Sequence, residues 1–171
     1  MEFYNCITSR KSIRKYIPNK DIKNTVISQI LQTANYTPSY KNLQPWKIHV
    51  VKNKEKINEI CKNSIYYEWM KNASVLLVIF LDGNKSFDRL KDLQSIGALI
   101  QNILLTSNNL GLGSCWIGEI LNKKDNIKKL LCVEKQYELM AIITIGYKDL
   151  TVNPHVRKRK NINEFILDWN E

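Results

Sequence analysis

Residues 92–110 have the sequence DLQSIGALIQNILLTSNNL, and this stretch decides the fold. Its apolar residues cover much of the circumference of a helix, which is typical of a helix buried in the middle of a protein. Gly111 follows directly and is most simply the residue that ends the helix, because glycine readily adopts the left-handed conformation found there. We therefore expect the rest of the chain to pack around this helix.

Three apolar stretches predict the strands of a sheet. Residues 46–51 and 138–147 each predict a strand. Residues 74–81 predict a strand that is buried on both faces, because apolar residues follow one another there without alternation.

The remaining periodic stretches predict shorter helices. Residues 21–34 form an amphipathic pattern with Asp21 as a candidate N-cap, and residues 54–62 and 123–131 predict two more helices. A few strands with one long buried helix indicate an α+β sandwich. The order of the elements is not the regular βαβ alternation of a dinucleotide-binding fold.

Length and composition predict one soluble domain over residues 1–171, because 171 residues with 44% hydrophobic content can bury a core. The longest apolar run, residues 75–81, is too short to span a bilayer, and no apolar run follows a basic head near residue 1. We expect an unprocessed cytoplasmic protein with no membrane partner. Its cysteines and histidines show no metal-ligand spacing, so we expect no metal and reduced thiols.

The net charge of +10 favours an anionic partner, which could be nucleic acid, an acidic surface or a phosphate-bearing cofactor. Charge alone does not choose among them. A composition rich in Lys, Asn and Ile also fits an AT-rich genome, in which case many lysines are solvated surface.

Two clusters concentrate this charge, SRKSIRKY at residues 9–16 and RKRK at residues 157–160. If the first were a helix, Arg10 would face Arg14 and Lys11 would face Lys15, where like charges repel. A bound anion would relieve that repulsion. The alternative is a solvated basic surface.

Two further stretches have the residue types of a ligand site. GLGSCWIG at residues 111–118 could bring backbone N–H groups close to an anion, although it lacks the GxGxxG spacing, so a nicotinamide would bind as a transient substrate. YTPSYKNLQP at residues 36–45 places Asn42 and Gln44 where their amides could contact the edge of a heterocycle. Taken alone, the first glycine is simply a helix end and the second stretch a turn. Nearby aromatic residues could stack on a flat ligand or belong to the core.

In this order, five motifs resemble the FMN-dependent nitroreductase family in its short form: SRKSIRKY, TPSYKNLQPWKIHVV, QSIGALIQNILL, GLGSCWIG, and IGY followed by RKRK. The match runs from Asn5 to Phe165. The resemblance implies a three-layer α/β/α sandwich with a mostly antiparallel central sheet, and an intertwined homodimer with FMN at its interface. NADH or NADPH would be the transient electron donor.

The resemblance also assigns the basic residues to the cofactor. Arg10, Lys11 and Ser12 would hold the phosphate and ribityl chain of FMN. Arg14 would reach the pyrimidine edge of the ring, where its positive charge would stabilise the reduced, anionic flavin.

The other contacts implied by the resemblance come from later in the chain. Arg157 and Arg159 would complete the phosphate clamp, and Pro38, Ser39 and Asn42 would come from the partner subunit.

No side-chain nucleophile or general base is evident, and the family requires none. The backbone N–H of Gly118 would face flavin N5, with Glu119 beside it. Hydride would pass from the nicotinamide through N5 to a nitroaromatic or quinone-like acceptor in a ping-pong reaction, and positioning and electrostatics would do the catalytic work.

The chain departs from the family pattern at two places. Gln94 and Ser95 stand where the family often has Gln-Asp, and only the short stretch DGNKSFDRLKD is available to cover the active site. The pocket is then either open or covered by the partner's Tyr66, Tyr67 and Trp69.

Other tasks remain open on the same fold: free-flavin reduction, reductive dehalogenation or redox sensing. A more distant alternative is a small basic nucleic-acid-binding protein, although the sequence has no helix-turn-helix pattern, zinc spacing or aromatic sheet motif.

Overall fold

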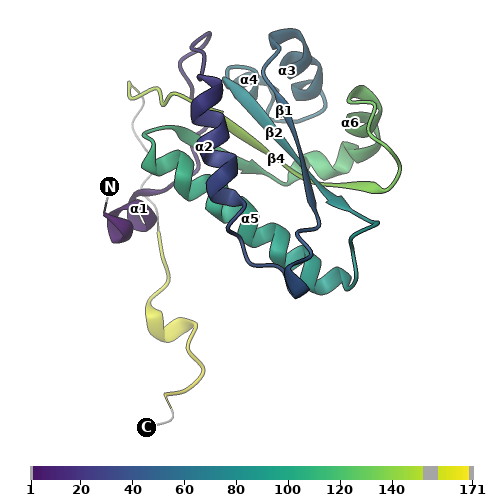
Figure 1. Ribbon diagram of the computed structural model, residues 1–171. Coiled ribbons are helices and arrows are strands. Elements are labelled where there is room, and N and C mark those ends of the chain that lie inside the picture. The colour runs from purple at the N-terminus through teal and green to yellow at the C-terminus, as the bar shows by residue number, and fades with distance from the viewer. Residues whose placement is uncertain (1, 152–157, 170–171) are drawn as a thin grey trace.

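Four strands form one antiparallel sheet within residues 2–151 and 158–169, which the computed structural model describes (Figure 1). They are β1 (Trp46–Val51), β2 (Val75–Asp82), β3 (Gly113–Ile117) and β4 (Tyr137–Gly146). Their order is β1-β2-β4-β3, and each pair of neighbours is antiparallel. The predicted strands are confirmed as β1, β2 and β4, whereas β3 was missed.

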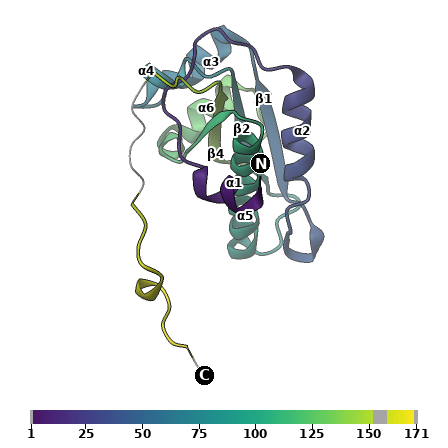
Figure 2. The ribbon, with the colours of Figure 1, turned by 90° about the vertical axis from the view of Figure 1, so that its left-hand side faces the viewer.

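Helices cover both faces of the sheet. The elements α2 (Asn24–Ala34) and α5 (Arg89–Asn109) pack on the face that holds Leu77 and Ile79 of β2. On the opposite face, α3 (Lys54–Cys61), α4 (Tyr67–Met70) and α6 (Lys124–Leu130) pack near Leu76 and Val78 (Figures 1 and 2). All eight residues of β2 are buried, which explains its unbroken apolar run and confirms the three-layer α+β sandwich.

The long helix α5 begins earlier than predicted and ends where predicted. Asp88 caps its start by accepting a hydrogen bond from the Lys91 N–H. At its end, the N–H groups of Gly111 and Leu112 donate to the carbonyl groups of Asn108 and Ser107. Gly111 has a φ of 78°, so this end is a Schellman turn that directs the chain into β3.

The start of α2 differs from the prediction. The helix begins at Asn24, and Lys23 occupies the N-cap position. Asp21 does not cap it, because its carboxylate pairs with Lys52 Nζ at 3.1 Å. The helices predicted at residues 54–62 and 123–131 are present as α3 and α6, each with slightly shorter bounds.

The two ends of the described chain lie beside or beyond this body. α1 (Phe3–Ser9) lies next to one end of α5, whereas residues 158–169, with the short turn η3 (Ile162–Glu164), extend away from the body in both views (Figures 1 and 2). Phe165, Leu167 and Trp169 of this arm are exposed. None of the helices in the described part of the chain combines the length and hydrophobicity that a membrane span requires.

Candidate functional site

The basic segment, residues 10–16, is extended rather than helical. It passes the edge strand β3, where Ser12 bridges to Ser114 and the Ile13 N–H donates to the Ser114 carbonyl at 2.9 Å. It then reaches the end of β4, where Tyr16 bridges to Lys148. The repulsion expected between Arg10 and Arg14 on a helix therefore does not arise.

Two glycines allow this close approach. A Cβ atom on Gly113 would lie 2.8 Å from Cγ2 of Ile13, and one on Gly146 would lie 2.7 Å from Cδ1 of Tyr16. Both distances are too short for real contacts, so any larger residue would push the basic segment away from the sheet.

Tyr16 anchors the segment through its hydroxyl group. The hydroxyl lies 2.8 Å from the Ile13 carbonyl oxygen, to which it can donate, and 2.8 Å from Thr144 Oγ1. Burial raises the pKa of Tyr16 far above its ordinary value. The phenol thus remains protonated and available as a donor.

The basic segment lies beside a lysine that sequence reasoning missed. Lys148 is half-buried, and its Nζ donates to Asn108 Oδ1 at 3.1 Å. Burial, and then the charge of Lys11, lower the pKa of Lys148. Within residues 2–151 and 158–169, no ion pair involves Lys11, Arg14 or Lys148. Lys148 directly follows the last predicted strand and has no local pattern that could have marked it.

Gly118 and Glu119 follow the end of β3. Gly118 is exposed and precedes the short helix η2 (Glu119–Lys123). Glu119 Oε2 accepts a 2.7 Å hydrogen bond from the buried Ser64, a contact that sequence reasoning also missed. Ser64 in turn accepts from the Tyr66 N–H, so the carboxylate is tied to the aromatic segment ahead of α4.

Aromatic rings connect this segment to the basic one. The Trp69 ring lies 5.7 Å from the Tyr66 ring and 6.3 Å from the Tyr16 ring, measured between centroids. Trp69 thus packs against the ring that anchors the basic segment. The aromatic, basic and glycine motifs meet around β3.

The loop at residues 38–44 has a strained backbone. Lys41, Asn42 and Gln44 all have positive φ angles, 49°, 54° and 47°. Ser39 Oγ accepts from the Gln44 N–H at 2.9 Å, and Asn42 Oδ1 accepts from Gln44 Nε2 at 3.1 Å. These hydrogen bonds hold the two polar side chains in a tight turn, whereas Pro38 is exposed at its start.

The same loop packs on the first turn of α5. The Tyr40 and Phe87 ring centroids are 5.8 Å apart, and Lys91 Nζ lies 4.3 Å from the Tyr40 centroid. Lys41 Nζ lies 4.2 Å above the Phe87 ring. The loop is therefore fixed to the N-terminal end of α5.

The basic segment, in contrast, lies at the C-terminal end of α5. Asn108 Nδ2 donates to Ser9 Oγ at 2.9 Å, just ahead of Arg10. Asn108 is 17 residues beyond Lys91, so these two attachment points lie about 25 Å apart along the helix. Within one chain, the structure does not bring Pro38, Ser39 and Asn42 to the basic segment.

Of the two tail arginines that were predicted to bind the phosphate, the structure describes only Arg159. Arg157 lies outside the described residues. Arg159 is exposed on the arm at residues 158–169, where its Nη1 donates to the Lys158 carbonyl at 3.1 Å.

Ser95, which stands where the family often has Asp, forms a hydrogen bond within its own helix. Its Oγ donates to the Lys91 carbonyl at 2.9 Å, so the hydroxyl is used within α5. One turn earlier, the fully buried Asp92 accepts hydrogen bonds from Ser86 Oγ and the Phe87 N–H. Its other oxygen has no hydrogen-bond partner among the described residues.

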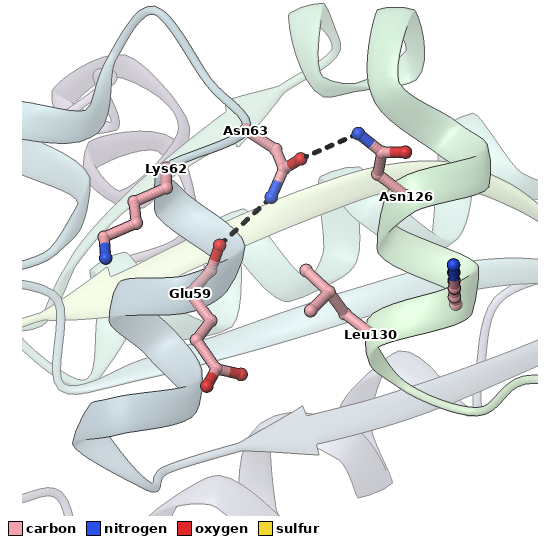
Figure 3. A pocket seen from close by; sticks show the side chains of 6 residues that line it. Glu59, Lys62, Asn63, Asn126 and Leu130 are labelled. Carbon is pink, nitrogen blue, oxygen red and sulfur yellow. Dashed lines mark hydrogen bonds between the residues drawn. The ribbon is translucent and has the colours of Figure 1, made fainter.

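A hollow of about 610 Å³ lies elsewhere, between α3 and α6 (Figure 3). Asn126 Nδ2 donates to Asn63 Oδ1 across it, and Asn63 Nδ2 donates to the Glu59 carbonyl. None of the residues that line this hollow belongs to the predicted cofactor set. We place the candidate site at β3 instead, where the basic segment and Gly118 lie.

Comparison with known proteins gives the family. The sequence model of the nitroreductase family matches residues 7–65 and 59–147. The chain belongs to the nitroreductase family. An Archaeoglobus fulgidus protein with the provisional name NADH dehydrogenase/NAD(P)H nitroreductase is 30% identical over 152 aligned positions, which cover 85% of each protein. Iodotyrosine deiodinase of Hydra vulgaris is 24% identical and covers 98% of this chain and 73% of its own.

A solved structure agrees with this assignment. A crystal structure of a Desulfovibrio desulfuricans protein in complex with FMN aligns with a TM-score of 0.91 and 26% identity. The alignment covers 99% of this chain and 97% of that one. The nitroreductase resemblance and the nitroreductase fold predicted from the ordered motifs are confirmed.

Proposed function

We propose that this chain is an FMN-dependent oxidoreductase of one domain that takes hydride from NADH or NADPH and passes it to a nitroaromatic or quinone-like acceptor. One observation carries the proposal: the bridge from Ser12 to Ser114 attaches the basic segment to β3, and Gly118 lies four residues further along. Four residues of strand span about 13 Å. That span suits a mononucleotide with its phosphate at one end and its ring at the other.

The donor groups of the basic segment suit a phosphate. Arg10 and Lys11 are half-buried cations, and Ser12 has an exposed hydroxyl group. Guanidinium, ammonium and hydroxyl groups form charge-assisted hydrogen bonds with phosphate oxygens. We assign these three residues to the phosphate and ribityl chain, and Arg14 to the pyrimidine edge of the ring.

At the other end of the site, the backbone N–H of Gly118 would face N5 of the ring. Glu119 would lie beside it, held by the hydrogen bond from Ser64. When bound, FMN would supply the redox chemistry as the hydride carrier between a nicotinamide and the acceptor in a ping-pong reaction. The protein would bind and orient the flavin.

We further propose that a second copy of the chain completes the site. The loop that holds Pro38, Ser39 and Asn42 is fixed at the opposite end of α5 from the basic segment, which supports its use by the partner's flavin. Exposed apolar side chains on α5 and on the arm support a homodimer, namely Leu90, Leu93, Phe165, Leu167 and Trp169. Arg157 and Arg159 would join the phosphate clamp in that assembly.

A cytoplasmic location belongs to the same proposal. All four cysteines are free, which suits a reducing compartment in which NADH and NADPH are available.

The first experiment identifies the cofactor. Purified protein should be yellow, and acid precipitation should release about one FMN per chain. NADH or NADPH should reduce the bound flavin under anaerobic conditions, and a nitroaromatic or quinone should reoxidise it. Recovery of FAD, or failure to take up FMN on reconstitution, would contradict the proposal.

Reductive dehalogenation is a second candidate, because the match to Hydra vulgaris iodotyrosine deiodinase covers nearly the whole chain. The same reduced protein should then release iodide from an iodinated phenol. Reoxidation by quinones or nitroaromatics without iodide release would favour the first candidate, and reoxidation by free flavin would indicate a flavin reductase.

A further inference from the structure

Lys148 is a half-buried cation beside the basic segment. Its Nζ donates to Asn108 Oδ1 at 3.1 Å, and the described residues give it no ion-pair partner. The nearby Asp149 directs Oδ1 to the N–H and hydroxyl of Thr151. The ammonium group thus lies in a partly desolvated place, and no acidic side chain of residues 2–151 and 158–169 pairs with it.

Asn108 connects Lys148 to the start of the basic segment. Its side chain is 5% exposed, and its Nδ2 donates to the Cys6 carbonyl at 3.0 Å and to Ser9 Oγ at 2.9 Å. One buried amide therefore orients the lysine with its oxygen and holds the turn ahead of Arg10 with its nitrogen.

The backbone fixes Lys148 against the same segment. Lys148 bridges to Tyr16, the Ile17 N–H donates to the Tyr147 carbonyl at 2.9 Å, and the Asp149 N–H donates to the Lys15 carbonyl at 3.2 Å. Because the residues before and after Lys148 are both hydrogen-bonded to residues 15–17, the backbone holds Lys148 in a fixed position beside the basic segment.

The local charges favour an anion at this place. Burial and the positive charge of Lys11 lower the pKa of Lys148, which means that the protonated form is held there at a cost. The charge of an anion next to Lys11 and Lys148 would offset the desolvation cost of Lys148 and the repulsion between the two lysines.

We propose that Lys148 is an additional phosphate-binding residue of the FMN site, and that Asn108 is the residue that positions it. The inference rests on the proposed function, which places the FMN phosphate at Arg10, Lys11 and Ser12. It adds a cation from the end of β4 that no sequence motif marks.

The test compares FMN with riboflavin, which has the same ring and ribityl chain but no phosphate. We expect Lys148→Gln to weaken FMN binding about 10- to 100-fold, the effect of losing a charge-assisted hydrogen bond, and to leave riboflavin binding unchanged. Lys148→Arg should retain most of the FMN affinity. Binding is followed by the quenching of flavin fluorescence in the apoprotein.

Asn108→Asp provides a second variant of nearly the same shape. The new carboxylate would pair with Lys148 and compete with the phosphate, although it would no longer donate to the Cys6 carbonyl. FMN affinity should therefore fall more than riboflavin affinity. Lys52→Gln is the matched control, because Lys52 is half-buried and donates to the Ile22 carbonyl near β1, at the opposite edge of the sheet. This control should leave both affinities unchanged.

A measurement on the unaltered protein covers the case in which the variants do not fold. Lysine acetylation by an amine-reactive ester, followed by mass spectrometry, should show that FMN protects Lys148 and riboflavin does not. Equal loss of both affinities in Lys148→Gln would reduce Lys148 to a structural role, and unchanged affinities or equal protection would overturn the inference. If the wild-type apoprotein binds no FMN, the proposed function itself fails.

Discussion

Gly113 and Gly146 lie opposite each other in the register of β3 and β4, and together they make room for the basic segment. Ile13 packs over the first glycine and Tyr16 over the second. Because this pair brings the segment onto the sheet, it sets the distance from Arg10 and Ser12 to Gly118.

We expect Gly113→Ala to destabilise the protein by about 1–3 kcal/mol, because the new methyl group would overlap Ile13 in a close-packed place. FMN affinity should fall as well, since the basic segment must move. Urea unfolding and flavin titration measure the two effects.

The control is a double-mutant cycle with Ile13→Ala, which removes the Ile13 Cγ2 and Cγ1 atoms, 2.8 and 3.1 Å from the new Cβ, and leaves the Ile13 Cβ at 3.0 Å. The loss caused by Gly113→Ala should be smaller in the Ile13→Ala background. Additive losses would show that the contact between these two residues is not the cause.

Arg10→Ala should weaken FMN binding by about 2 kcal/mol, because it removes a charge-assisted contact to the phosphate. The affinity is measured by fluorescence titration of the apoprotein. Lys52→Gln is a suitable control, since Lys52 donates to the Ile22 carbonyl near β1, at the opposite edge of the sheet from β3. If Arg10→Ala leaves the FMN affinity unchanged, the basic segment is a solvated surface rather than a phosphate site.

Mixing an Arg10→Ala subunit with an Asn42→Ala subunit tests whether two chains share each flavin site. If the basic segment and the loop of one chain serve different sites, one site of the heterodimer has both defects and the other is intact. About half of the wild-type activity should then return, although each parent homodimer is impaired.

Separately tagged subunits allow the heterodimer to be purified for this measurement. If the activity of the heterodimer stays at the level of the two parent homodimers, the basic segment and the loop at residues 38–44 of one chain serve the same site. The distance of about 25 Å along α5 between their attachment points predicts the opposite result.

The Arg89–Glu138 pair should stabilise the protein in a pH-dependent way. Two hydrogen bonds of 2.5 and 3.0 Å join the guanidinium and carboxylate groups, and they lower the pKa of Glu138. A lowered pKa in the folded state means that the stabilisation is present above the ordinary glutamate pKa and is lost as pH falls through the folded value.

Because both side chains are partly exposed, the effect should not exceed about 1 kcal/mol. The free energy of unfolding in urea should differ between wild type and Glu138→Gln at pH 7, and this difference should shrink at pH 3. A difference that is equal at both pH values would exclude the ion pair as its source.

The sequence alone predicted those elements whose signals are local. The unbroken apolar run of β2 and the helical pattern of α5 are properties of neighbouring residues, and Gly111 ends α5 because it adopts a positive φ. The order of the motifs also identified the family, since each motif is short and contiguous.

Only the tertiary structure decided features that depend on residues far apart in the chain. The stretch GSCWI has a glycine and no clear alternation, and it becomes β3 because β4 supplies its hydrogen-bond partners. Asp21 pairs with Lys52 rather than capping α2, and Lys148 joins the candidate site through Asn108, 40 residues earlier. Such pairings follow from packing in three dimensions, which leaves no periodic trace near either residue.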